Sequence, residues 1–225
     1  MTAQFRAVLV GDLKNLRAMV EPQFGADDIR LIHVLRPLAA LLVQDNALDE
    51  AVVLQRRIYN LCLKFKGNPN LPSLSEARKS LAASLQSLGR YDEALPLLQL
   101  CIAEDGDESA TSTLVDCLQG LGRFQEAISL CEQKVSQAAQ LDASKSGTAQ
   151  LSWLLNLSRC YSRQDDYARA AEVIERTIPL MAARAEVLCI PQLDMLAELY
   201  RKAGNLAEHD RVRAKRREIA DRCNY

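Results

Sequence analysis

The chain has 225 residues, of which 48% are hydrophobic and 25% are charged, and its formal net charge is −1. This balance supports a substantial core and excludes a disordered chain or a strongly basic nucleic-acid-binding protein. Few aromatic residues and an abundance of Ala, Leu, Glu, Arg and Gln favour helices over an all-β fold.

The N-terminal segment lacks the layout of a secretory signal peptide, because Arg6 precedes only four apolar residues before Gly11 and Asp12. No apolar run approaches the ~18–20 residues that a membrane-spanning helix needs. We therefore expect a soluble, cytoplasmic protein. The cysteines are odd in number and form no Cys-x-x-Cys pair, which predicts reduced core thiols and not disulfides or a zinc site. They are Cys62, Cys101, Cys117, Cys131, Cys160, Cys189 and Cys223.

Residues 1–26 are expected to form a helical cap or an extra hairpin, and not a separate domain. Within them, Asp12 is positioned to cap a helix over residues 13–20. Asp27 or Asp28 is positioned to cap the next helix, over residues 29–44. Pro37 lies inside that helix, so we expect it either to kink the helix or to move its start.

A short pattern then recurs along the chain. It consists of a turn-forming residue, an apolar residue two positions later and, in most copies, alanine five positions later. The turn residues fall at 46, 89, 122, 165 and 204, so the spacings are 43, 33, 43 and 39 residues. In the last copy His209 replaces the alanine, which predicts a looser, terminal hairpin with a structural histidine. Spacings of this size are typical of helical-hairpin repeats.

Each turn is flanked by helical periodicity. Before Gly89, for example, apolar residues fall at positions 77, 81, 85 and 88, and after it the pattern resumes at Tyr91. Two amphipathic helices joined by so short a turn form an antiparallel hairpin. Glycine provides the left-handed backbone conformation that ends the first helix, and Asn46 and Asp165 tolerate that conformation. The alanine lets the two helices approach closely, as at Ala94.

Helix-start signals agree with this register. Ser73 with Glu76 three residues later has the spacing of a capping box. Asp107 or Ser109 is positioned to cap the following helix, and Pro191 suits the opening turn of a later one. Residues 66–70 and 142–147 are expected to be loops between hairpins.

These residues resemble the tetratricopeptide repeat, whose hairpin has a Leu-small pair, Gly-x-Tyr at the turn and Glu-Ala opening the second helix. Leu81-Ala82, Gly89-Arg-Tyr91 and Glu93-Ala94 match that pattern. The long spacing and the Pro72-to-Gly89 distance resemble the kinesin-light-chain-like branch. The resemblance implies an all-α solenoid of about five stacked hairpins over residues 27–225, the last degenerate and basic, forming a right-handed superhelix.

The resemblance also implies that the first helix of each hairpin lines a concave groove. The resulting surface is polar, with basic residues that could pair with an acidic peptide, although solvated surface charge explains them equally well. Gln119 occupies one of these positions. The other candidate binding residues are Arg36, Lys79, Gln86, Asp116, Asn156, Arg159, Arg163, Glu198, Arg201 and Lys202.

No motif for catalysis is present, and His33 and His209 have no acid or cysteine motif beside them. We therefore expect neither an enzyme nor a cofactor or metal site. The leading interpretation is a protein-interaction scaffold or adaptor. The alternative is a regulatory or sensor module that works with a separate DNA-binding or signalling protein. A third interpretation, nucleic-acid binding through the basic stretch 201–225, is less favoured because acids are interspersed there. The oligomeric state stays open.

Overall fold

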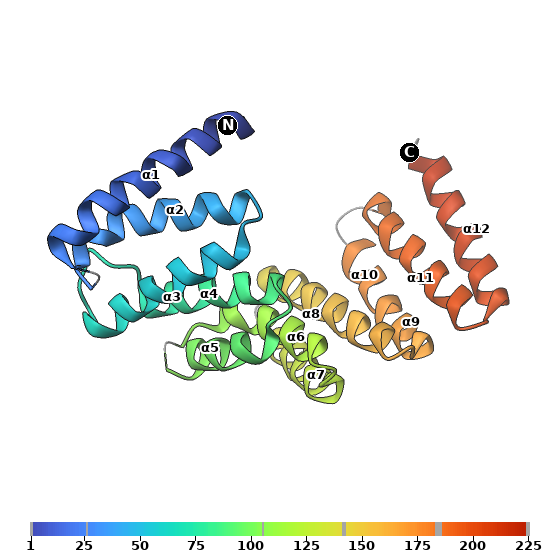
Figure 1. The fold of residues 1–225 in the computed structure, drawn as a ribbon. Coiled ribbons are helices and arrows are strands. Elements are labelled where there is room, and N and C mark those ends of the chain that lie inside the picture. The colour runs from blue at the N-terminus through green and yellow to red at the C-terminus, as the bar shows by residue number, and fades with distance from the viewer. Residues whose placement is uncertain (1, 26, 105, 141–142, 183–185, 224–225) are drawn as a thin grey trace. The chain divides into compact units, whose positions relative to one another are not determined.

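The computed structural model describes residues 2–25, 27–104, 106–140, 143–182 and 186–223, which contain helices and no strand (Figure 1). The chain divides into two compact units, residues 1–121 and 122–225. Each unit is built from helices that pack mainly on their neighbours in sequence. This arrangement confirms the predicted all-α repeat solenoid. None of the described helices is long and apolar enough to cross a membrane.

The described residues of the first unit form six α-helices. Their ranges are α1 Ala3–Phe24, α2 Ile32–Gln44, α3 Leu48–Lys64, α4 Leu74–Ser87, α5 Tyr91–Ala103 and α6 Thr111–Gly120. Short 3-10 turns, η1 Ile29–Leu31 and η2 Glu108–Ala110, precede α2 and α6. The helices α2 to α6 contact one another in chain order, and α1 packs on α2.

Six further α-helices lie in the part of the second unit that the structure describes. Their ranges are α7 Phe124–Ala139, α8 Ala143–Arg163, α9 Tyr167–Glu175, α10 Thr177–Ala182, α11 Ile190–Lys202 and α12 Leu206–Cys223. The 3-10 turn η3, Glu186–Cys189, leads into α11. Here α8 packs between α7 and α9, and α11 contacts both α9 and α12.

All five predicted turn residues have the left-handed conformation. Gly89, Gly122 and Gly204 have φ angles of 72°, 72° and 76°, and Asn46 and Asp165 have 59° and 60°. In each copy the next helix begins two residues later. The amide after Gly89 donates back to the carbonyl of Leu85 at 2.8 Å, which is the 6→1 bond of a Schellman motif. The predicted register is therefore confirmed.

Small residues lie where the two helices of a hairpin cross. Ala94 and Ala170 are fully buried, as predicted for the alanine of the pattern. In the second unit the Ser158 hydroxyl donates to the carbonyl oxygen of Ala170 at 3.0 Å, which joins α8 to α9. His209 stands in the alanine position on α12, and its Nδ1 lies 2.9 Å from the carbonyl oxygen of Ala197 on α11. This contact is consistent with the structural role predicted for His209.

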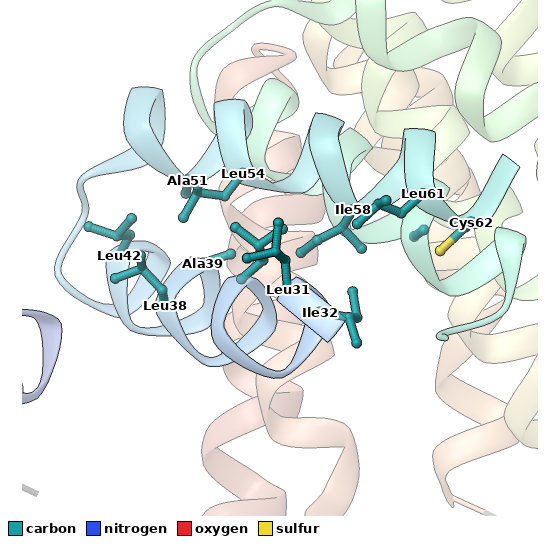
Figure 2. Packing of buried hydrophobic residues seen from close by; sticks show 12 residues of the cluster. Leu31, Ile32, Leu38, Ala39, Leu42, Ala51, Leu54, Ile58, Leu61 and Cys62 are labelled. Carbon is teal, nitrogen blue, oxygen red and sulfur yellow. The ribbon is translucent and has the colours of Figure 1, made fainter. Parts of the chain in front are cut away.

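A continuous apolar cluster of the first unit lies between α2 and α3. Leu31 of η1 and Leu38 and Leu42 of α2 meet Leu54 and Leu61 of α3 (Figure 2). Each fully buried leucine contributes about 1.5–3 kcal/mol relative to an exposed one. This cluster fixes the spacing of α2 and α3, and so it positions the surface described below.

Several local expectations were confirmed. Ser73 caps α4, because its Oγ accepts a hydrogen bond from the Glu76 amide at 3.1 Å. Asp107 accepts from the Ser109 amide at 3.0 Å at the start of η2. Pro191 lies in the first turn of α11.

Two expectations about helix boundaries were wrong. Thr2, and not Asp12, caps the first helix, which continues through Gly11 to Phe24. Of the two alternatives for Pro37, a later start at the proline is not what the structure has, because α2 begins at Ile32 and contains Pro37. The expected loop 142–147 is mostly helical, because α8 begins at Ala143; residue 142 lies outside the described residues.

Candidate functional site

A cavity of about 450 Å³ lies between α2 and α4 in the first unit. Its walls include Ala39 and Ala40 from α2 and Ala77 and Ala83 from α4. Alanine side chains end at the methyl group, so they leave the space between the two helices unfilled. The half-exposed Val43 extends the apolar wall along α2. The arrangement can accept an apolar side chain of a partner.

A buried polar group borders the same cavity. Gln55 of α3 is only 8% exposed, and its Oε1 atom has no hydrogen-bond partner among the residues that the structure describes. A buried acceptor left unsatisfied costs about 1–3 kcal/mol. Gln55 was not among the predicted site residues. Its signal in the sequence is a polar residue between Leu54 and Ile58, inside the apolar stripe of its helix.

An ion pair crosses from α2 to α4 at the edge of this cavity. The Arg36 guanidinium lies 2.9 Å from the Glu76 carboxylate, and about half of each side chain is exposed. An exposed pair of this kind contributes about 0–1 kcal/mol to stability. The predicted binding residue Arg36 is therefore already neutralised by its own chain. A partner carboxylate would have to compete with Glu76.

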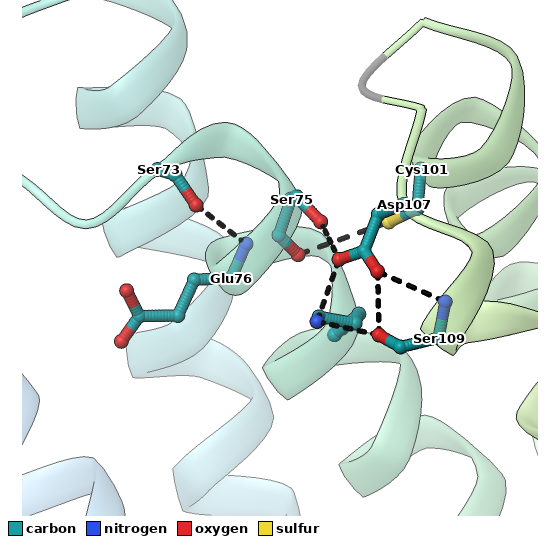
Figure 3. A network of polar contacts seen from close by, with 7 residues as sticks. Ser73, Ser75, Glu76, Cys101, Asp107 and Ser109 are labelled. Atoms are coloured by element: carbon teal, nitrogen blue, oxygen red, sulfur yellow. Dashed lines mark hydrogen bonds and ion pairs between the residues drawn. The ribbon is translucent and has the colours of Figure 1, made fainter. Parts of the chain in front are cut away.

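A second polar network joins α4 to the connection between α5 and η2, and it centres on Asp107 (Figure 3). The Lys79 ammonium lies 2.6 Å from the Asp107 carboxylate and donates to the Ser109 hydroxyl at 3.0 Å. The hydroxyls of Ser75 and Ser109 also donate to Asp107. The Lys79 contact, followed by the two serine hydroxyls, holds the pKa of Asp107 well below its usual range. This network fixes the end of the α5–η2 connection against α4.

The candidate residues of the second unit do not form one cluster of unpaired cations. Arg159 donates to the Asn156 side chain at 2.9 Å on α8, and Arg201 lies 2.6 Å from Glu198 on α11. The Lys202 ammonium lies 5.3 Å from the centroid of the Tyr167 ring, within cation–π range.

Four other predicted residues have different environments. Gln86 on α4 and Asp116 on α6 are partly buried. Gln119 is 4% exposed, so its side chain is not on the surface, contrary to the expectation that it lines a groove. The exposed Arg163 lies at the end of α8 and has no ion pair within the described ranges of the chain.

Several basic residues of the C-terminal helix α12 form ion pairs with acidic residues of the same chain. On α12, Arg211 lies 3.2 Å from Glu208 and Arg222 lies 3.7 Å from Glu218, and Arg216 lies 3.1 Å from Asp194 of α11. These contacts favour the solvated-surface interpretation over a phosphate-binding one. Among the described residues, no group of three His, Cys, Asp or Glu side chains is arranged to hold a metal ion.

Comparison with known proteins gives a consistent result. Two tetratricopeptide-repeat models match the chain, one over residues 76–107 and the other over residues 107–183. A search of curated protein sequences found no match.

Several solved structures share the fold. A putative kinesin light chain with nearly identical TPR-like repeats from Podosopora anserina is 22% identical with a TM-score of 0.68, and the match covers 87% of this chain and 98% of that one. BtubC (BKLC) from P. vanneervenii is 19% identical with a TM-score of 0.65, and the match covers 100% of this chain and 93% of that one. PlcR from Bacillus thuringiensis was solved with the peptide PapR7 and DNA. It is 14% identical with a TM-score of 0.53, and the match covers 88% of this chain and 72% of that one.

Proposed function

Since this chain is a tetratricopeptide-repeat protein, we propose that it is a protein-interaction scaffold that binds a segment of a partner on the α2–α4 surface. The observation that carries the proposal is the cavity of about 450 Å³ with alanine-lined walls. The described residues offer no acid–base pair or nucleophile motif around it, which favours binding over catalysis. A partner segment would insert an apolar side chain between the two helices.

The polar groups at this site would orient the partner segment. Gln55 offers an unsatisfied acceptor to a donor on the partner. The Arg36–Glu76 pair offers both charges to the partner backbone or side chains. Because buried polar groups that lack partners penalise a wrong ligand, Gln55 would contribute to selectivity more than to affinity.

Filling the cavity tests this proposal. The double variant Ala40→Leu/Ala83→Leu places larger side chains on both walls. Ala103→Leu on α5, an exposed alanine outside the cavity, is the matched control. Peptides selected on an array by the wild-type chain should lose about ten-fold or more in affinity for the double variant, equivalent to about 1.4 kcal/mol. Selected peptides that bind all three proteins equally would show that this surface is not the binding site.

The preference for acidic partners is proposed for the second unit. Arg163 is exposed and lacks an ion pair among the described residues, and Arg159 is exposed one turn before it. Charge reversal of both residues should weaken binding of acidic peptides and leave neutral ones unchanged. Arg123→Glu on α7, where Arg123 lies 2.7 Å from Glu126, is the control for charge reversal as such. Equal loss in the control would contradict the preference.

A regulatory module is the second candidate function. It is favoured by the fold shared with PlcR, which was solved with a peptide and DNA. Copurification from the native cell with mass spectrometry distinguishes the two. Recovery of a DNA-binding or signalling protein, lost in the cavity-filling double variant, would support the regulatory role. Recovery of partners of other kinds, lost in the same way, would support the scaffold.

A further inference from the structure

The N-terminal helix α1 is attached to the first unit with little burial. None of its side chains that the structure describes is buried, whereas α2 and α3 are built around buried residues. Val10, Leu13 and Val20 are only partly buried against the core cluster. On the other side of α1, Phe5 and Met19 are 60% and 67% exposed. The hydrophobic contribution to the docking of α1 is therefore small for a helix of 22 residues.

Ion pairs provide much of the remaining attachment. Arg6 lies 2.8 Å from Asp45 at the end of α2, Lys14 lies 2.6 Å from Glu50 on α3, and Glu21 lies 2.8 Å from Arg57 on α3. Partly exposed pairs contribute about 0–1 kcal/mol each, and salt screens them. The docking of α1 should therefore weaken as the ionic strength rises.

The packing beneath α1 is incomplete. A cavity of about 470 Å³ lies between α1 and the α2–α3 pair. Leu38 and Leu42 of α2 and Leu54 of α3 line it. Val53, at its edge on α3, is 63% exposed. Leu38, Leu42 and Leu54 are at most 3% exposed, so α1 covers these three leucines and leaves Val53 uncovered.

The end of α1 allows it to turn away. Pro22 lies in the last turn, and the helix ends at Gly25, whose φ of 83° and ψ of 159° are accessible mainly to glycine. The helices α2 and α3 also pack on each other through their own apolar cluster (Figure 2). Release of α1 would uncover Leu38, Leu42 and Leu54 and leave the contacts between α2 and α3 in place.

We propose that α1 is a releasable cover and that the surface beneath it, formed by Leu38, Leu42, Val53 and Leu54, binds an amphipathic helix of a partner protein. The charges around this surface specify the occupant. Asp45 and Glu50 require basic residues, and Arg57 requires an acidic one. The partner helix therefore carries a basic, basic and acidic residue at intervals of about eight and seven, as α1 does at positions 6, 14 and 21.

Release is tested by amide hydrogen exchange on the full chain. Residues 3–24 should exchange faster than α2 and α3, and faster still when the salt rises from ~0.1 M to ~1 M, which shortens the Debye length from about 10 Å to about 3 Å. Lys14→Ala/Arg57→Ala should accelerate exchange of α1 alone. Arg56→Ala, which removes the exposed α3–α5 pair with Glu93 at 2.7 Å, is the matched control and should leave α1 unchanged. Protection of α1 equal to that of α2, unaffected by salt, would overturn the proposal.

Binding at the uncovered surface is tested with a synthetic peptide of residues 2–25. This peptide should bind the Arg6→Ala/Lys14→Ala full chain at least about ten-fold more tightly than the wild-type chain, whose own α1 competes. The same peptide carrying Arg6→Glu, Lys14→Glu and Glu21→Lys should not bind. Equal binding of the two peptides, or no binding to a variant whose α1 exchanges freely, would overturn the surface assignment. Dimerisation of the variant chain through exchanged α1 helices would identify a second copy as the occupant and overturn the partner proposed here.

Discussion

Gly120 lies at the end of α6, where an added methyl group would collide with an aromatic ring. A Cβ atom built on Gly120 would lie 2.5 Å from the ring of Tyr91, the first residue of α5. The aromatic residue of the repeat pattern therefore packs directly on helical backbone of the following repeat. Tyr91 and Ala94 serve packing, so the most recognisable residues of the pattern lie outside the proposed binding surface.

Gly120→Ala should therefore destabilise the first unit by about 1–3 kcal/mol, because the ring must move. Replacing a glycine inside a helix by alanine usually has the opposite effect, because it raises the free energy of unfolding by up to about 1 kcal/mol. Gly11→Ala is the matched control, since nothing lies within 4 Å of a Cβ added there. Urea unfolding followed by circular dichroism measures both. Similar free energies of unfolding for the two variants would contradict the Tyr91 contact.

Ala94→Leu should also destabilise the first unit, by about 1–3 kcal/mol or more. Ala94 is fully buried at the crossing of α4 and α5, so a larger side chain forces the helices apart. The exposed Ala103→Leu on the same helix should change the free energy of unfolding by less than about 0.5 kcal/mol. A wild-type melting curve for Ala94→Leu would show that the hairpin register is wrong.

At the scale of the helices, Asp107 links the end of the α5 connection to α4. Its folded-state pKa is lowered by Lys79 and two serine hydroxyls. A lowered pKa stabilises the fold above the unfolded value of about 3.9 and loses that effect as the pH falls below it. The wild-type chain should therefore lose more stability between about pH 5 and pH 2 than Asp107→Asn does. Asp92→Asn on α5 is the control and should follow the wild-type curve.

The helix turns were predictable from sequence because the left-handed conformation is open to few residue types. Gly, Asn and Asp at the five positions were sufficient to place them. The helix starts were harder to place. Residues 143–147 contain two serines and a glycine, which favour a loop, yet they extend α8 because adding residues to an existing helix costs less than nucleating one. Asp12, the expected cap, lies inside α1 for the same reason.

The candidate site was only partly predictable for a related reason. Arg36 and Lys79 were identified from their positions in the repeat, but the sequence does not show that Glu76 and Asp107 neutralise them, because those contacts join different repeats. The cavity depends on four alanines from two helices, and Gln55 faces it from a third. Such features depend on the packing of helices and not on the pattern within one helix.

At the scale of the whole chain, the cysteines report on folding. Six of the seven are buried, as expected for core residues, whereas Cys223 is exposed, contrary to that expectation. Burial, with a smaller effect of Asp116, raises the pKa of Cys117 to about 11, so its reactive thiolate is scarce at neutral pH. With a thiol reagent, one cysteine per chain should react rapidly and six only after urea is added. Rapid reaction of several thiols in buffer would contradict the packing of both units.

The backbone geometry of the five turns has a consequence for recognising such repeats from sequence. The 6→1 hydrogen bond uses only backbone atoms, and the same bond follows Asn46, Gly89, Asp165 and Gly204. The fold therefore requires a torsion angle at these positions and not one particular side chain. Three residue types provide that angle in this chain, so residue identity alone does not relate the five turns. Searches for degenerate repeats should accordingly treat Gly, Asn and Asp as equivalent at this position.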